Sequence, residues 1–179
     1  MEEPDRQQRE SAAAPVFCAG NRQGLWRVCN ALMSVFFGLA AYVQVNDPDA
    51  EVWMVIYLVP SVLVLLVSVN SDITGHGVWR ALADLHCAVC LTGAVYLLGK
   101  LFMDSRESIL HEEEGRELSG LGIIALWLLL CRKTHKQIVG GFRLFIAVSV
   151  SVFPFLIWLY IYINKEMRTS WPQHCKTVI

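Results

Sequence analysis

The stretch QVNDPDAEVWMVIYLVPSVLVLLVSV, residues 44–69, decides the fold of this chain. It opens with acidic residues that no Lys or Arg balances, and it continues over residues 50–69 as an almost wholly apolar run. A helix that spans a bilayer needs about 20 mostly apolar residues, because each residue adds ~1.5 Å of rise. We therefore predict that residues 50–69 cross a membrane and that the acidic residues form a corner at its surface.

The composition of the whole chain agrees with a membrane protein. Apolar residues make up 55% of the 179 residues and charged residues 17%, whereas a soluble domain usually has about a quarter of charged residues. The charges lie in short segments between long apolar runs. The net charge is −1, and no basic patch with interleaved aromatic residues occurs, so we expect the lipid bilayer and no nucleic acid as a partner.

Five apolar runs define the expected fold class, which is an all-α, multi-pass bundle of membrane helices. The fourth run along the chain, LSGLGIIALWLLLC at 118–131, has only 14 residues, or ~21 Å against a hydrocarbon core of ~30 Å. It crosses if the helix recruits the polar residues before it; otherwise it is a re-entrant or interfacial segment beside four spans. The expected spans are 25–45, 50–69, 78–99, about 115–132 and 142–163.

The chain ends complete the predicted organisation. Residues 1–24 form a polar tail that we expect to be disordered, residues 25–163 the bundle, and residues 164–179 a short C-terminal tail. No cleavable signal peptide is expected, since the first apolar run is full length. Five spans would divide Lys and Arg nine to six in favour of the N-terminal side, which favours a cytoplasmic N-terminus.

The acidic corner has a structural interpretation. Asp47 is a preferred N-cap, Pro48 suits the first helical position, and Asp49 and Glu51 then lie in the first helical turn. Negative charge there meets the positive end of the helix dipole. Helix-end stabilisation alone therefore accounts for these residues.

A second acidic segment, HEEEGRE at 111–117, keeps a binding interpretation open. A solvated helix face with internal ion pairs explains it, but five spans would place it at the same membrane face as the acidic corner. Oxygen ligands from both segments would suit a hard cation or a polar substrate. The pattern is not the H-E-x-x-H zinc signature, and it identifies no particular metal or cofactor. The candidate polar or cation site consists of Asn46, Asp47, Asp49, His111, Glu113 and Glu117.

Asp84 and His86 form a candidate intramembrane pair within the third run. Arg80 and Asp84 are four residues apart, so we expect an ion pair along one helix face. His86 is interpreted as a hydrogen-bonded core histidine or, alternatively, as a proton carrier. Ionisable groups inside a membrane invite a functional hypothesis, but one carboxylate and one imidazole support only a limited one.

Several other residues favour helix packing. A stripe of small residues, Ala31, Ser34, Gly38 and Ala41, would let another helix approach and offers a face for a homo- or hetero-oligomer. Cys87 and Cys90 are spaced as in a redox or zinc motif, but without a second pair we expect them to be packing thiols. Pro154 is expected to kink the last helix.

The last four residues, KTVI, resemble the C-terminal peptide that a PDZ domain binds. That partner requires a cytoplasmic C-terminus, which the five-span charge distribution disfavours and a four-span fold would favour.

The stretches QVNDPDAEVW, ILHEEEGRELSGL, FPFLIWLYIYINKEMR and the ending HCKTVI are similar to the transmembrane protein 220 family. The resemblance covers about residues 25–179 and implies a small multi-pass membrane protein. It implies no enzymatic activity, cofactor or substrate at particular residues.

Three classes of function follow from the residues. A non-enzymatic membrane protein that acts through helix packing or partner binding is favoured, since no nucleophile–base pair, phosphate loop or nicotinamide fingerprint occurs. The alternative is a membrane-embedded metal-dependent enzyme or cation-binding protein that uses the acidic cluster. A transporter or proton pathway through Asp84 and His86 is the third class, and it needs a polar path across an otherwise apolar helix.

Overall fold

The computed structural model describes residues 3–46, 49–103, 113–132 and 141–164. Within these ranges the chain forms helices and no strand, which confirms the predicted all-α class. The apolar runs supply the long helices, and two short 3₁₀ segments lie at the corners. The elements are α1 (Glu3–Val43), η1 (Gln44–Asn46), α2 (Ala50–Val69), η2 (Ser71–Gly75), α3 (Gly77–Met103), α4 (Glu113–Arg132) and α5 (Gly141–Ile163).

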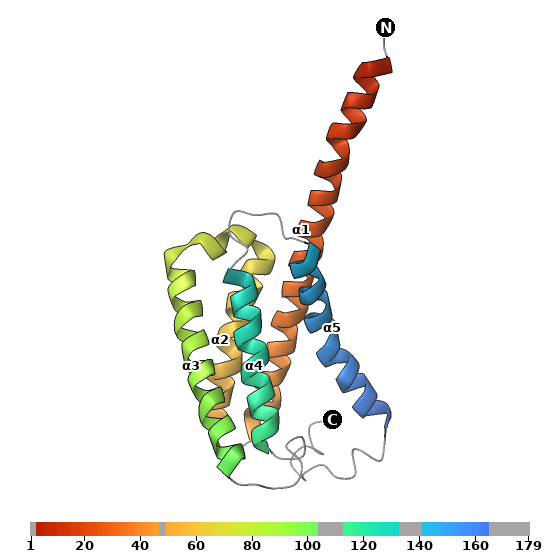
Figure 1. The fold of residues 1–179 in the computed structure, drawn as a ribbon. Coiled ribbons are helices and arrows are strands. Elements are labelled where there is room, and N and C mark those ends of the chain that lie inside the picture. Colours follow the sequence, from red (N-terminus) through yellow and green to blue (C-terminus); the bar gives the residue numbers. More distant parts are fainter. Residues whose placement is uncertain (1–2, 47–48, 104–112, 133–140, 165–179) are drawn as a thin grey trace.

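The helices alternate in direction, and α1 to α4 lie side by side (Figure 1). The corner between α1 and α2, the end of α3 and the start of α4 lie at one end of the bundle, which we call the acidic end. The corner between α2 and α3, the end of α4 and the start of α5 lie at the other, which we call the basic end. The first part of α1 projects beyond the basic end. Its helical backbone begins at Glu3, within the residues for which the sequence predicts a disordered tail.

Three of the described helices are long and apolar enough to cross a membrane: Asn21–Val43, Ala50–Val69 and Gly77–Lys100. A shorter apolar stretch, Gly141–Ile157, belongs to α5. The sequence of α4 begins EEGRE, and these charges lower the hydropathy of an otherwise apolar helix. The protein is therefore a membrane protein with three clear candidate spans, and the crossings by α4 and α5 stay predictions.

Two serines clasp α1 against α2. Ser34 Oγ donates to Ser61 O and Ser61 Oγ donates to Ser34 O, each at 2.9 Å. A Cβ on Gly38 would lie 3.6 Å from Ser61 Oγ, an ordinary van der Waals distance, so Gly38 lies on the face of α1 that α2 covers. α2 of the same chain therefore covers part of the small-residue stripe. These small residues of α1 serve helix packing inside the bundle.

A buried amide joins α1 to α4. Asn30 is fully buried, and its Oδ1 accepts hydrogen bonds from Trp127 Nε1 and Cys131 Sγ, both at 3.2 Å. Asn30 Nδ2 donates to Trp26 O at 2.7 Å. The rings of Trp26 and Trp127 stack with their centroids 6.1 Å apart. These bonds offset the cost of removing an amide from water, which would otherwise be several kcal/mol.

At the basic end, Arg27 closes the last turn of α2. Its Nε donates to Ser68 O at 2.7 Å and its Nη2 to Val69 O at 2.9 Å, while Ser68 Oγ donates back to Arg27 O at 3.1 Å. The last carbonyls of a helix lack partners within it and carry partial negative charge. One guanidinium therefore satisfies two of them and fixes α1 to the end of α2.

Candidate functional site

The acidic end begins with a cap that differs from the predicted one. α2 starts at Ala50 with Asp49 as its N-cap residue, so the predicted helix start at Pro48 is wrong. The Asp49 carboxylate does not cap the helix, because its Oδ2 accepts from Trp53 Nε1 at 2.9 Å. Glu51 lies in the first turn, as predicted, and is exposed.

One face of α2 extends from this cap toward α4. Asp49, Trp53 and Tyr57 follow each other at successive turns, and the rings of Trp53 and Tyr57 lie 6.3 Å apart. Tyr57 is buried, and its hydroxyl occupies the space that a Cβ on Gly120 of α4 would need. Gly120 therefore lets Tyr57 pack against α4 three residues after Glu117.

The contact between Tyr57 and Gly120 agrees with Asp49 and Glu117 lying at the same end of the bundle. Asp49 lies two turns before Tyr57 and Glu117 lies one turn before Gly120 (Figure 1). Of the candidate site, the side chains of Asp49 and Glu117 are described. Asn46 and Glu113 are described by their backbone only, and Asp47 and His111 lie outside the described residues.

The described residues contain no group of three or more His, Cys, Asp or Glu side chains that could hold a metal ion. Asp49 is already bonded to an indole N–H, which occupies one of its carboxylate oxygens. The geometry can present carboxylates at one end of the bundle, and the described residues supply no cation ligand set there.

Asp84 is paired with a different residue from the one predicted. Asp84 Oδ1 lies 2.9 Å from Nη1 of Arg132, at the end of α4, and both side chains are about two-fifths exposed. The predicted ion pair between Arg80 and Asp84 is therefore wrong, because the side of α3 that carries Asp84 faces α4. This pair ties α3 to α4 near the basic end.

His86 contacts another helix. Its Nε2 lies 3.0 Å from Ile56 O of α2, and its side chain is buried. Two residues turn an α-helix by about 200°, so Asp84 and His86 face opposite sides of α3. The structure gives the two members of the candidate intramembrane pair separate partners on α4 and α2.

Four cysteines have described side chains, and all four are buried free thiols: Cys29, Cys87, Cys90 and Cys131. Cys131 donates to Asn30, a contact that sequence reasoning missed along with Asn30 itself. A polar residue in the middle of an apolar run was the available indication, since such residues in membranes find partners on other helices. The KTVI ending lies outside the described residues.

Comparison with known proteins identifies the family. The family described as "Transmembrane family 220, helix" matches residues 36–133, which include α2, α3, α4 and the acidic corner. Transmembrane protein 220 of Xenopus laevis is 66% identical over 164 residues, which cover 92% of this chain and 89% of that protein. No solved structure matches the chain. The chain therefore belongs to the transmembrane family 220.

Proposed function

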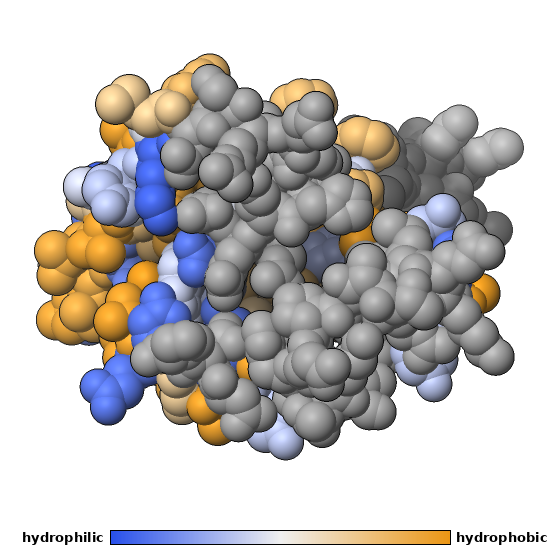
Figure 2. Space-filling model, turned by 90° about the horizontal axis from the view of Figure 1, so that it is seen from below, coloured by the Kyte–Doolittle hydropathy of each residue, from blue (hydrophilic) through white to orange (hydrophobic). Residues whose placement is uncertain are grey.

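We propose that this protein is a five-span, non-enzymatic membrane protein that binds a partner at its acidic end. The observation that carries the proposal is the placement of exposed Asp49 and Glu51 at the same end as Glu117. Figure 2 views the molecule from this end, where hydrophilic residues lie beside a hydrophobic flank.

The polar side chains inside the bundle form hydrogen bonds between helices, which indicates that they stabilise the fold. Asn30 binds α4, the two serines clasp α1 to α2, and His86 bonds a backbone carbonyl of α2. Each bond joins two helices, which is how polar side chains stabilise membrane bundles. The carboxylates at the acidic end are the groups that we assign to recognition.

The chemistry of the acidic end favours a partner with basic residues next to its membrane segment. Exposed carboxylates at an interface rim accelerate encounter with a positively charged surface and select against negatively charged ones. Another membrane protein with juxtamembrane Lys or Arg residues fits this description. Soluble salt should weaken the interaction, because charges separated by more than about 8 Å are screened at physiological ionic strength.

Site-specific photo-crosslinking in cell membranes tests the proposal. A photoreactive residue is placed at exposed Val52 on the acidic end or at exposed Val78 on the basic end. We expect protein adducts from Val52 that Glu51→Lys abolishes and that Asp72→Lys, an exposed acid beyond the end of α2, leaves unchanged. Adducts that are equal at both ends, or that persist in Glu51→Lys, would contradict binding through the acidic end.

A cation-binding protein or metal-dependent enzyme is the second candidate, favoured by the same placement of Asp49 and Glu117. Metal analysis of purified protein distinguishes it, with the wild type compared with Asp47→Ala. Bound Ca²⁺ or Mg²⁺ that Asp47→Ala loses would support this candidate. Metal-free protein in both samples would eliminate it and leave partner binding.

Two finer proposals concern partners of other chemistry. A PDZ-type partner at KTVI requires a cytoplasmic C-terminus. An oligomer would need a helix face other than the part of α1 that Ser61 of α2 already occupies. Both proposals are separable from binding at the acidic end, because neither uses Asp49, Glu51 or Glu117.

A further inference from the structure

A proline in the middle of α2 leaves a backbone carbonyl without its helical partner. Pro60 is fully buried inside the helix, and it has no N–H to donate to the carbonyl of Ile56 four residues earlier. In a bilayer core, no water is available to hydrogen-bond that carbonyl. Leaving it unbonded is therefore costly unless another group donates to it. Proline also weakens a helix locally, which makes this position a potential hinge.

His86 of α3 meets the carbonyl that Pro60 frees. The two atoms, His86 Nε2 and Ile56 O, lie 3.0 Å apart, and the His86 side chain is buried between the helices. Because a carbonyl oxygen only accepts, the imidazole holds its proton on Nε2 and donates it. The histidine thus takes the place of the backbone N–H that proline lacks.

A second bond of the same type provides an internal standard. Trp79 Nε1 donates to Leu63 O at 3.1 Å, also from α3 to a backbone carbonyl of α2. Trp79 and His86 are seven residues apart, as are Leu63 and Ile56, so the two bonds lie two turns apart along antiparallel helices. Leu63 O has the N–H of Val67 as its partner within the helix, whereas Ile56 O lacks that partner because residue 60 is a proline.

We propose that Pro60, Ile56 and His86 form a latch, in which His86 holds a hinge of α2 closed against α3. This inference does not depend on the proposed partner or on the acidic end. Loss of the histidine donor frees the Ile56 carbonyl, and α2 then bends at Pro60. The bend changes the angle between the half of α2 that carries Asp49 and the half to which Arg27 is bonded.

A double-mutant cycle on the full-length protein in nanodiscs tests the latch. His86→Leu should lower the folding equilibrium constant by roughly 5- to 150-fold, the range for an orphaned buried acceptor. In the Pro60→Ala background, the N–H of residue 60 meets Ile56 O, so His86→Leu should cost several-fold less. The steric effect of His86→Leu is common to both backgrounds and cancels in the comparison.

The internal standard makes the cycle specific. Trp79→Phe removes the second hydrogen bond from α3 to a carbonyl of α2, and its effect should be the same with Pro60 and with Pro60→Ala. Equal effects of His86→Leu in both backgrounds would overturn the latch. If His86→Leu does not fold, Pro60→Ala should restore folding, and failure to do so would also overturn it.

Hinge opening has its own measurement. Spin labels on non-native amino acids at exposed Val52 and Val69 report the length of α2 across Pro60. His86→Leu should shorten and broaden the distance distribution, and adding Pro60→Ala should restore it. His86→Gln, which retains an N–H donor, should keep a narrow distribution. An unchanged distribution in His86→Leu would show that α2 contains no hinge held by His86.

Discussion

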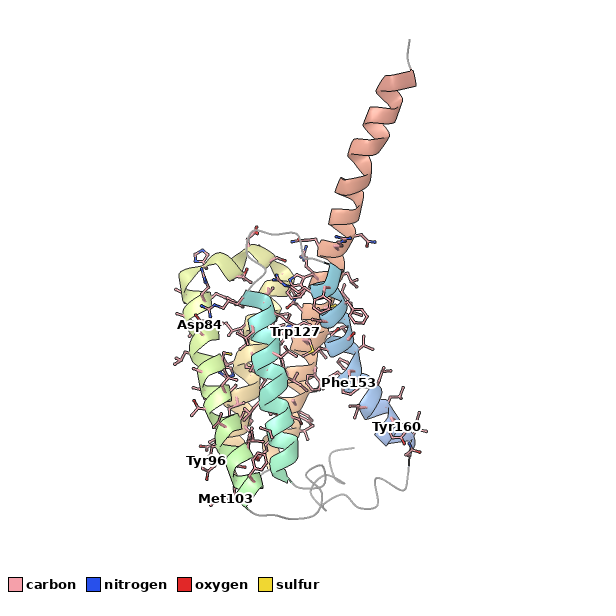
Figure 3. The ribbon with its side chains drawn as sticks, in the orientation of Figure 1. Asp84, Tyr96, Met103, Trp127, Phe153 and Tyr160 are labelled. Atoms are coloured by element: carbon pink, nitrogen blue, oxygen red, sulfur yellow. The ribbon has the colours of Figure 1, made fainter. Side chains whose placement is uncertain are left out.

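The two helices that contain a proline, α2 and α5, are fixed in the molecule very differently. In α2, Pro60 is buried and the carbonyl it frees is bonded by His86. In α5, Pro154 frees the carbonyl of Val150, and no side chain of the described residues donates to it. α2 lies within the bundle, whereas α5 diverges from it, with Tyr160 farther from the bundle than Phe153 (Figure 3).

The difference shows that the neighbours of a proline decide how a membrane helix accommodates it. α2 has α1, α3 and α4 against it, through Ser61, His86 and Tyr57 respectively. α5 contacts α1 at Phe155, the residue after Pro154, whose ring lies edge-on to that of Phe36 with the centroids 6.0 Å apart. Helix packing and interhelical hydrogen bonds hold α2 on three sides, whereas α5 packs against α1 and diverges from the bundle toward its end. Substitutions in the bundle should therefore cost more than equivalent substitutions in α5.

The largest expected effect is that of Asn30→Leu. It leaves two buried donors, Trp127 Nε1 and Cys131 Sγ, without their acceptor, so we expect the free energy of unfolding to fall by about 2–4 kcal/mol. Asn164→Leu at the end of α5 removes a local bond to Tyr160 O and should cost under ~0.5 kcal/mol. Thermal unfolding in detergent measures both. Similar losses would mean that α5 is packed as firmly as the bundle.

Gly120→Ala should have the next largest effect. Its Cβ would overlap the buried hydroxyl of Tyr57, and overpacking of this kind costs about 1–3 kcal/mol. Gly122→Ala is the control on the same helix, because nothing lies within 4 Å of its Cβ position. Tyr57→Phe removes the hydroxyl and should recover part of the loss. A neutral Gly120→Ala would show that α2 and α4 do not meet at this point.

The smallest expected effect is that of Asp84→Asn. The ion pair with Arg132 is about two-fifths exposed on both sides, and pairs of this kind contribute about 0.2–1 kcal/mol. The loss should shrink as salt is raised, which unfolding at two ionic strengths would reveal. Arg80→Gln should leave the stability unchanged, since Asp84 pairs with α4. A larger loss of stability for Arg80→Gln than for Asp84→Asn would contradict this pairing. It would support the ion pair between Arg80 and Asp84 that their spacing predicts.

Much of the fold follows from local features of the sequence. α2 occupies residues 50–69, the apolar run itself, because a polar corner precedes it and Asn70 ends it. α4 recruits the charged residues before its short apolar run, and it begins at Glu113. Run length and flanking polarity are properties of one segment, so a single sequence displays them.

Contacts between helices were harder to predict. The spacing of Arg80 and Asp84 suggests a pair along α3, but the partner of Asp84 comes from α4, 48 positions away. The missing N–H of Pro60 is visible in the sequence, whereas the donor that replaces it depends on which helix lies beside α2. The shared end of Asp49 and Glu117 follows from alternating helices, and Tyr57 and Gly120 supply the contact.

The number of membrane crossings tests the account most directly, because five crossings place the two termini at opposite water boundaries, with the acidic end opposite the N-terminus. Glycosylation acceptor tags are attached to the N-terminus in one variant and to the C-terminus in another, and each is expressed with native membranes. Five crossings with a cytoplasmic N-terminus predict a modified C-terminal tag and an unmodified N-terminal tag. If both tags are glycosylated, or if neither is, the two termini lie on the same side of the membrane. Either result would contradict the five-span fold.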